Sequence, residues 1–296
     1  MLAYLKLIRL PNAFTALADI IAAYTVMNFF GSSATLAGLC GASAALYLSG
    51  MAFNDLADRE EDARVRPNRP IPSGKVSVRG AALCGIILML AGIALTALSW
   101  TSSLPWAVLL AASILAYDFG TKGITVLGPV TLGFCRFFNV LSGSGASSDS
   151  VMAIIRSAKP FQAPLASALA IGIYAAGLTA FSAQEESGKQ MRSILTGWIF
   201  CGAALLIAGL SASPYAWIIL GPLALLLASK TAALAKSGTP QAARDLVRTG
   251  VMGVCAVDAG LILGFAGLSA WPWAVGCLAL LIPTIAIAKW LAQKEA

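Results

Sequence analysis

The chain has 296 residues, of which 58% are hydrophobic and 11% charged, and its mean hydropathy is +0.82. This composition excludes an ordinary water-soluble globular protein and favours a bundle of membrane helices. The formal net charge of +7 does not point to nucleic acid as a partner, because no DNA- or RNA-binding motif accompanies it.

Apolar runs long enough to cross a hydrocarbon layer of about 30 Å recur along the chain. All are predicted to be helices, because isolated strands would leave backbone groups unpaired in lipid. In chain order the predicted spans are 12–30, 35–56, 78–99, 103–118, 125–143, 162–183, 191–210, 213–234, 243–268 and 271–291. Since 103–118 is short and 243–268 begins with charged residues, we expect nine or ten spans. The sequence therefore predicts an all-α, polytopic membrane bundle forming one domain over 1–296, with 271–291 as an extra C-terminal helix.

The Lys and Arg residues predict the orientation, since cytoplasmic loops hold an excess of both. With ten spans and the N-terminus inside, all but three of the 20 Lys and Arg residues fall on the cytoplasmic side. The exceptions are Arg136, inside a predicted span, and Arg156 and Lys159, in an outside loop. We therefore expect a multi-pass protein of the cell (inner) membrane, in contact with membrane lipids, with both termini cytoplasmic.

Missing residue types narrow the chemistry. The sequence contains no histidine, which excludes His-based acid–base catalysis and His-ligated zinc. The six cysteines lie in predicted spans without a CxxC pair, which is typical of small core residues. Any reaction must then use carboxylates, cations, amides, hydroxyls and a hard metal ion.

The segment 52–75, "AFNDLADREEDARVRPNRPIPSGK", concentrates charge in an otherwise apolar chain. Asp55, Asp58 and Asp62 are spaced three and then four residues apart, so a continuous helix would stack them within about 60° of one another. Stacked acids repel unless cations sit on them, and carboxylates at a membrane boundary are usually functional. Mg²⁺ prefers such oxygen ligands, and Asn54 adds an amide oxygen.

A plainer alternative treats the same acids as a solvated helix end that pairs with Arg59 and Arg64. The apolar residues before Asn54 argue against it, because they place Asp55 near the membrane boundary. The loop that follows carries Arg66, Arg69 and Lys75 between three prolines that exclude a helix. A stiff basic loop beside an acidic metal site favours diphosphate as the ligand, since Arg makes paired contacts with phosphate oxygens.

The acidic motif followed by "RPNRPIPSGK" resembles the first aspartate-rich motif and following loop of the UbiA superfamily of intramembrane prenyltransferases. The opening "LIRLPNAFTA" is also similar, and the resemblance extends over residues 1–268. The stretch "YDFGTKGITVLGPVTLGFCRFFNVLSG" and the extra last helix resemble most closely the UbiA-like branch called EboC. The resemblance implies a helical bundle around a central, lipid-accessible cavity, in which Mg²⁺ and a prenyl diphosphate bind. The prenyl group is then transferred to a hydrophobic acceptor, aromatic or lipid-like.

The resemblance also implies roles for individual residues. The first metal motif corresponds to Asn54, Asp55, Asp58 and Asp62, whose three carboxylates would also be catalytic. Arg69, with Arg66 beside it, would contact the diphosphate. Two further catalytic candidates, Tyr117 and Lys122, resemble the family's Tyr-x-x-x-Lys element, with one extra residue between them.

The second aspartate-rich motif of the superfamily is altered in this chain. Its place reads "LTAFSAQEESGKQMRS", with Glu185 and Glu186 instead of two aspartates spaced by four. Adjacent side chains point about 100° apart on a helix, so the two glutamates cannot form a stacked face. We assign both to diphosphate binding and Glu186 to the metal, with an ordinary solvated loop as the alternative.

Ionisable residues inside predicted spans need partners. Arg136 and Asn139 lie three residues apart and should face the same way. Arg136 either pairs with Asp19 or Asp258 as a structural bridge, or contacts the diphosphate or the acceptor. Both readings stay open at this point.

Three other functions compete with Mg²⁺-dependent prenyl transfer. A CDP-alcohol phosphotransferase needs an Asp-Gly-x-x-Ala-Arg run, which does not occur. A small-molecule transporter should carry polar groups near mid-membrane in both halves, whereas the charge here gathers at cytoplasmic helix ends. A non-catalytic isoprenoid-binding relative is consistent with the altered second motif.

Overall fold

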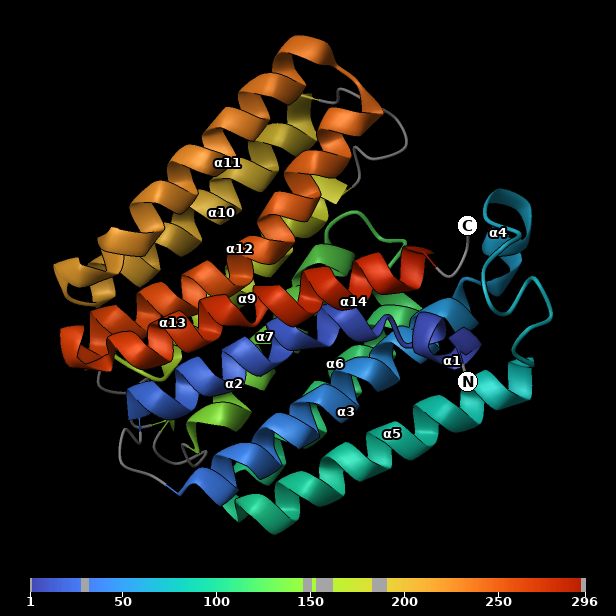
Figure 1. The fold of residues 1–296 in the computed structure, drawn as a ribbon, viewed down its shortest axis with the longest axis horizontal. Helices are drawn as coiled ribbons and strands as arrows, with labels where there is room; N and C mark the ends of the chain where they lie inside the picture. The colour runs from blue at the N-terminus through green and yellow to red at the C-terminus, as the bar shows by residue number, and fades with distance from the viewer. Residues whose placement is uncertain (1, 28–31, 146–150, 153–161, 183–190, 294–296) are drawn as a thin grey trace.

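The computed structural model describes residues 2–27, 32–145, 151–152, 162–182 and 191–293, and all regular structure in these segments is helical (Figure 1). The first half contains α1 (Leu2–Leu7), η1 (Leu10–Asn12), α2 (Ala13–Met27), α3 (Ser33–Ala57), α4 (Arg59–Val65), α5 (Val78–Ser99), η2 (Thr101–Ser103), α6 (Leu104–Ala116), η3 (Tyr117–Thr121) and α7 (Leu127–Ser144). The second half contains α9 (Leu165–Ser182), α10 (Met191–Ser211), η4 (Pro214–Ala216), α11 (Trp217–Ser237), α12 (Pro240–Ala266), η5 (Leu268–Ala270), α13 (Trp271–Ala279) and α14 (Leu281–Gln293).

Nine stretches of the described residues are long and apolar enough to cross a membrane. The weakest predicted span, 103–118, becomes a stretch of 21 residues, Thr101–Thr121, because short turns extend α6 at both ends. The predicted span 125–143 forms α7, which has 18 residues and is not among the nine. The all-α, multi-pass membrane fold predicted from the sequence is confirmed.

The helices pack as two groups that meet along α7 and α12 (Figure 1). In the first group α3 lies along α5, and α7 packs against α2 and α6. In the second, α9 packs on α10, and α12 packs on α11. The groups are joined where α7 meets α9 and where α12 meets α2. α13 lies against α12 and α2, and α14 lies against η1 and α2. The largest buried cluster is formed mainly by α7, α9, α10, α11 and α12, and a separate cluster lies among α3, α5 and α6.

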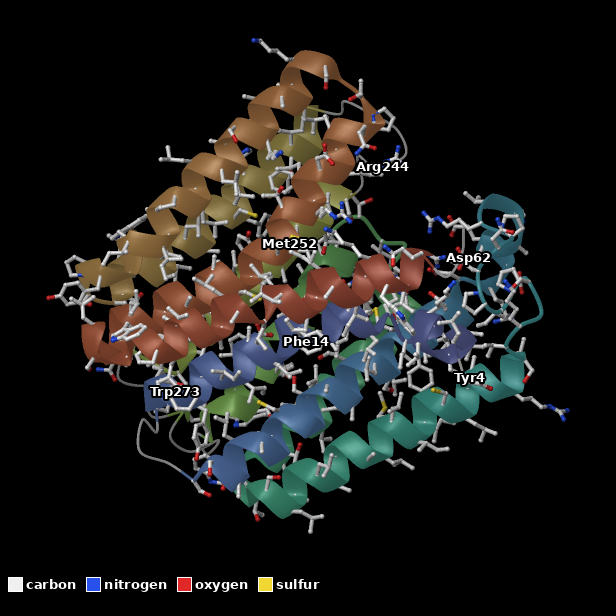
Figure 2. All side chains as sticks on the ribbon, in the orientation of Figure 1. Tyr4, Phe14, Asp62, Arg244, Met252 and Trp273 are labelled. Atoms are coloured by element: carbon white, nitrogen blue, oxygen red, sulfur yellow. The ribbon has the colours of Figure 1, made fainter. Side chains whose placement is uncertain are left out.

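Large apolar side chains on the outer helices point away from this core. Leu98 on α5, Leu210 on α10 and Leu225 on α11 are 84%, 75% and 74% exposed. Such a surface is unfavourable in water and is expected for helices that face lipid. Asp62 and Trp273 lie toward opposite ends of the bundle (Figure 2).

Small residues let α7 and α9 approach closely, as expected in membrane bundles. A Cβ atom added at Gly172 would lie 2.9 Å from the carbonyl oxygen of Gly133, and one at Gly133 would lie 2.8 Å from that of Gly172. The two backbones therefore touch where neither residue has a side chain.

Replacing Gly172 with Ala should lower the melting temperature of the detergent-solubilised protein by about 5 °C, because the two helices must separate. Gly221→Ala is the matched control, since nothing lies within 4 Å of a Cβ at that position. We expect Gly221→Ala to leave the melting temperature unchanged or raise it, because Ala favours helix over Gly. Equal losses in the two variants would contradict this account of the α7–α9 contact.

Candidate active site

The acidic segment is not one continuous helix. α3 ends at Ala57 and α4 begins at Arg59, with Asp58 between them at φ −81° and ψ 0°. The expectation that three carboxylates stack on one helical face is therefore wrong, because the helix is interrupted at the middle one. Asp55 and Asp62 are buried, whereas the Asp58 side chain remains 19% exposed and turns to a different partner.

The carboxylates of Asp55 and Asp62 converge on Arg69. Its Nη1 donates to Asp55 Oδ1 at 3.2 Å and to Asp62 Oδ2 at 2.6 Å. Arg66 lies 3.8 Å from Asp62 and is about half exposed. A single guanidinium nitrogen thus occupies the point where two buried acids meet, and the solvated-helix-end alternative does not describe these two carboxylates. Arg59 pairs with the exposed Glu60 instead.

Apolar side chains fix the basic loop in place. Ile71 and Val76 are buried against Leu7, Ala52 and Ala81, so the loop is tied to α1, α3 and α5. Backbone hydrogen bonds, including one from the Val76 N–H to the Pro70 carbonyl at 3.0 Å, close the turns between the prolines. The loop therefore holds Arg69 over the acids.

Arg9 is a further member of the site, although the sequence predicted no role for it there. Its Nη2 donates to Asp55 Oδ1 at 2.7 Å and to Asn54 Oδ1 at 3.3 Å. The residue has φ +46°, a left-handed conformation that costs a non-glycine residue of order 1 kcal/mol and is often kept at functional sites. The only sequence signal for Arg9 was its place in "LIRLPNAFTA".

Lys122 reaches Asp58, and the two form an ion pair. The extra residue in the Tyr117…Lys122 element is absorbed by a π-helical turn over Tyr117–Thr121, in which the Lys122 N–H donates to the Tyr117 carbonyl at 3.0 Å. Such a turn adds one residue to a helical turn and frequently lies at a functional site. The helix thereby places Lys122 on the acidic motif in spite of the longer spacing.

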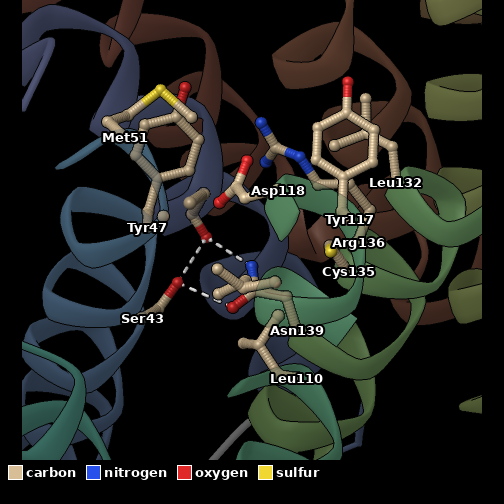
Figure 3. Close-up of a pocket in the computed structure, with 13 residues that line it drawn as sticks. Ser43, Tyr47, Met51, Leu110, Tyr117, Asp118, Leu132, Cys135, Arg136 and Asn139 are labelled. Carbon is tan, nitrogen blue, oxygen red and sulfur yellow. Dashed lines mark hydrogen bonds between the residues drawn. The ribbon is translucent and has the colours of Figure 1, made fainter. Parts of the chain in front are cut away.

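Asn54 links the charged cluster to a central cavity. Its Nδ2 donates to Asp118 Oδ1 at 3.1 Å, and Asp118 lines the cavity together with Tyr117 (Figure 3). The cavity has a volume of about 80 Å³ and its wall is largely apolar and aromatic. Its other named contributors are Ala16, Ser43, Tyr47, Gly50, Met51, Leu110, Ile114, Leu132, Cys135, Arg136 and Asn139. The charged cluster and an apolar chamber are therefore neighbours.

Arg136 and Asn139 face the same way, as predicted, and both bind the buried Asp19. Arg136 Nη1 and Asn139 Nδ2 each donate to Asp19 Oδ2 at 2.9 Å. Arg136 Nη2 also donates to Thr15 at 2.8 Å, and its guanidinium lies over the Tyr47 ring. This is the structural bridge that the sequence left open, with Asp19 as the ion-pair partner. Arg136 and Asn139 also form part of the cavity wall.

The second acidic motif, with Glu185 and Glu186, lies outside the described residues. Its assignments therefore stay predictions.

The donor chemistry of the first motif suits Mg²⁺. Asp55 and Asp62 already converge on a cationic nitrogen, and every candidate ligand offers a hard oxygen. Within the described part of the chain, no three acidic or cysteine side chains are grouped closely enough to hold a metal alone. Mg²⁺ is usually held by one or two carboxylates, its own waters and substrate phosphates, so two converging carboxylates meet the requirement.

The fold and this site define a class: a multi-pass membrane protein with a charged cluster beside a largely apolar cavity. The model of the UbiA prenyltransferase family matches residues 12–249, and the chain belongs to that family. A digeranylgeranylglyceryl phosphate synthase of Methanothrix thermoacetophila is 38% identical over 101 residues, which is 34% of this chain and 38% of that protein. The chain thus matches well under half the length of this relative.

Two solved structures share the fold. The apo structure of a UbiA homolog from Aeropyrum pernix K1 has a TM-score of 0.65 at 19% identity, covering 86% of this chain and 98% of that one. The structure of a UbiA homolog from Archaeoglobus fulgidus bound to GPP and Mg²⁺ has a TM-score of 0.55 at 13% identity, covering 94% and 99%.

Proposed function

We propose that this protein transfers a prenyl group from a prenyl diphosphate to a hydrophobic acceptor inside the membrane. The observation that carries the proposal is the position of Arg9 and Arg69 on the buried Asp55, beside a largely apolar cavity. Cations and carboxylates suit a diphosphate bridged by a metal ion, and the cavity suits an isoprenoid chain. Family membership and the GPP and Mg²⁺ of the Archaeoglobus fulgidus homolog support the same reading.

In the proposed reaction the allylic carbon–oxygen bond breaks and its electron pair leaves with the diphosphate. The acceptor atom then bonds to the allylic carbon and loses a proton. In this proposal Arg9, Arg69 and Lys122 bind the diphosphate and stabilise the charge that grows on it, an effect worth several kcal/mol. Mg²⁺, held through Asp55 and Asp62, would neutralise part of that charge.

The cavity wall supplies the second requirement, which is the exclusion of water from the allylic cation. Tyr47, Leu110, Ile114 and Leu132 present apolar or aromatic surface to the space beyond Asp118. Burial of an isoprenoid chain there contributes up to about 0.8 kcal/mol per CH₂ group. In the orientation that we propose, the charged end faces the cytoplasm and both chain termini lie on that side.

Removal of the metal tests the proposal. Isothermal titration of the nanodisc-embedded protein with geranyl diphosphate should show an affinity at least about 100-fold lower in EDTA than in Mg²⁺, because the acids then repel the ligand. Empty nanodiscs serve as the control. Equal affinity under both conditions would refute the proposal.

Pyrophosphate release, measured with a panel of phenols, quinols and lipid alcohols, separates an enzyme from a non-catalytic relative. We expect release with at least one of these acceptors, and release should require Mg²⁺. Metal-dependent binding without release for every acceptor in the panel would indicate an isoprenoid-binding member that does not transfer.

A further inference from the structure

Asp118 is a carboxyl group in the wall of an otherwise largely apolar chamber, and neither aspartate-rich motif includes it. Its residue is 8% exposed and contributes to the cavity lining. The π-helical turn that begins at Tyr117 lets Asp118 face the cavity while Lys122, on the same turn, reaches Asp58. Figure 3 shows the Asp118 carboxylate directed toward the space between the lining side chains.

Only one of the two Asp118 oxygens has a partner in the described part of the chain. Oδ1 accepts from Asn54 Nδ2 at 3.1 Å, whereas no hydrogen bond is formed by Oδ2. Nor does any described cation form an ion pair with Asp118, because Lys122 pairs with Asp58 and Arg136 with Asp19. Oδ2 is not among the fully enclosed unpartnered atoms of the described residues, and Asp118 is part of the cavity lining.

A carboxyl oxygen without a partner is costly in a membrane-embedded apolar chamber and is usually kept for function. Arg9, Arg69 and Lys122, the cations suited to a diphosphate, form their ion pairs with Asp55, Asp62 and Asp58 and not with Asp118. A carboxylate disfavours an anion, so its free oxygen suits a cation or a group that carries a hydrogen-bond donor. An alcohol or phenol in the cavity meets this condition.

We infer that Asp118 Oδ2 accepts a hydrogen bond from a hydroxyl group of the acceptor and so selects and orients hydroxyl-bearing acceptors. The inference rests on the proposed prenyl transfer. The Asn54 amide then lies between this hydroxyl and the proposed diphosphate site. This arrangement brings the acceptor to the reacting end of the prenyl chain, whose tail extends along the apolar wall.

A structural role for Asp118 would be to hold Asn54 toward Arg9. Asp118→Asn separates the two roles, because the new side chain retains an oxygen that accepts from Asn54 and replaces Oδ2 with an NH₂ group. If Asp118 only positions Asn54, this variant behaves like the wild type. If Oδ2 binds the acceptor, the variant loses its preference for a hydroxyl.

The test compares 1-naphthol with 1-methoxynaphthalene, which differ in one O–H group. Binding of each to the full chain in nanodiscs is measured by titration calorimetry, with partition into empty nanodiscs subtracted. We expect the wild type to bind 1-naphthol at least about tenfold more tightly than the ether, as is usual for a hydrogen bond to a charged group. In Asp118→Asn the ratio should fall to about twofold or less, because NH₂ donates to either oxygen.

Two controls make the result specific. Asp245→Asn carries the same change on α12, where Asp245 accepts from Gln241 outside the cavity lining, and should keep the wild-type ratio. Geranyl diphosphate binding in Mg²⁺ should change by less than about threefold in Asp118→Asn. A wild type without the preference, or an Asp118→Asn variant that retains it, would overturn the inference. If the wild type did not bind geranyl diphosphate in a Mg²⁺-dependent way, that result would instead refute the proposed function.

Discussion

Asp62→Asn should lower prenyl transfer by at least about 100-fold, the size of effect seen when one charge-stabilising group is removed from an active site. Asp62 is 2% exposed, and its carboxylate is one of the two that converge on the Arg69 nitrogen. With one carboxylate left, the proposed site should bind Mg²⁺ more weakly, so half-saturation of geranyl diphosphate binding should require more metal. The measurement is a Mg²⁺ titration of binding and of pyrophosphate release.

Glu61→Gln is the matched control for this variant. Glu61 precedes Asp62 on α4, is exposed, and has no described ion pair, so removing its charge should change transfer by less than about twofold. The fold should survive in Asp62→Asn, because Arg69 keeps its ion pair with Asp55 and the amide oxygen at position 62 can still accept from it. Equal losses in the two variants would attribute the effect to net charge near the membrane, and an unchanged Mg²⁺ requirement in Asp62→Asn would remove Asp62 from the metal site.

The membrane helices were predictable because the length of an apolar run is a local property of the sequence. The predicted run 78–99 coincides with α5, and the basic loop after Asp62 is non-helical, as its prolines indicate. The interruption at Asp58 was not predictable in this way, because no Pro or Gly marks it. It goes with contacts from elsewhere in the fold, because Arg69 binds the acids on either side, Asp55 and Asp62, whereas Lys122 binds Asp58.

The site was predictable where a motif brings residues together along the chain, and not where the fold does so. The placement of Arg69 beside the acids follows from a short loop. Arg9 is 46 residues from Asp55, and nothing in the local sequence joins them. The sequence did contain a signal for Asp118, because an acid at the end of a predicted apolar span is by itself an indication of function.

The polar groups of the described cavity lie at two stations with different tasks. The outer station is Asp118, which Asn54 links to the charged cluster. The inner station is Arg136 with Asn139, both bound to Asp19. Asp118 keeps its Oδ2 without a hydrogen-bond partner among the described residues, whereas Arg136 and Asn139 donate to Asp19. We therefore expect the inner station to contribute to stability and the outer station to select the ligand.

Asp19→Asn should be among the most destabilising single changes in the chain. Asp19 is fully buried, and its Oδ2 is the only described ion-pair partner of Arg136. Loss of one member of a buried pair leaves the other charge uncompensated, at a cost of about 3–5 kcal/mol. We expect the melting temperature in detergent to fall by about 10 °C, and Asp19→Asn combined with Arg136→Met should recover part of that loss.

Asp258→Asn is the matched control, since Asp258 is equally buried and its carboxyl lies beside that of Asp19. Neither Asp258 oxygen has a hydrogen-bond donor among the described residues, and two carboxyls can bond only when one is protonated. An amide at position 258 donates to the free Asp19 Oδ1 in the same way, so stability should change by less than about 1 kcal/mol. A large loss in Asp258→Asn, with little in Asp19→Asn, would assign the Arg136 charge to Asp258 instead.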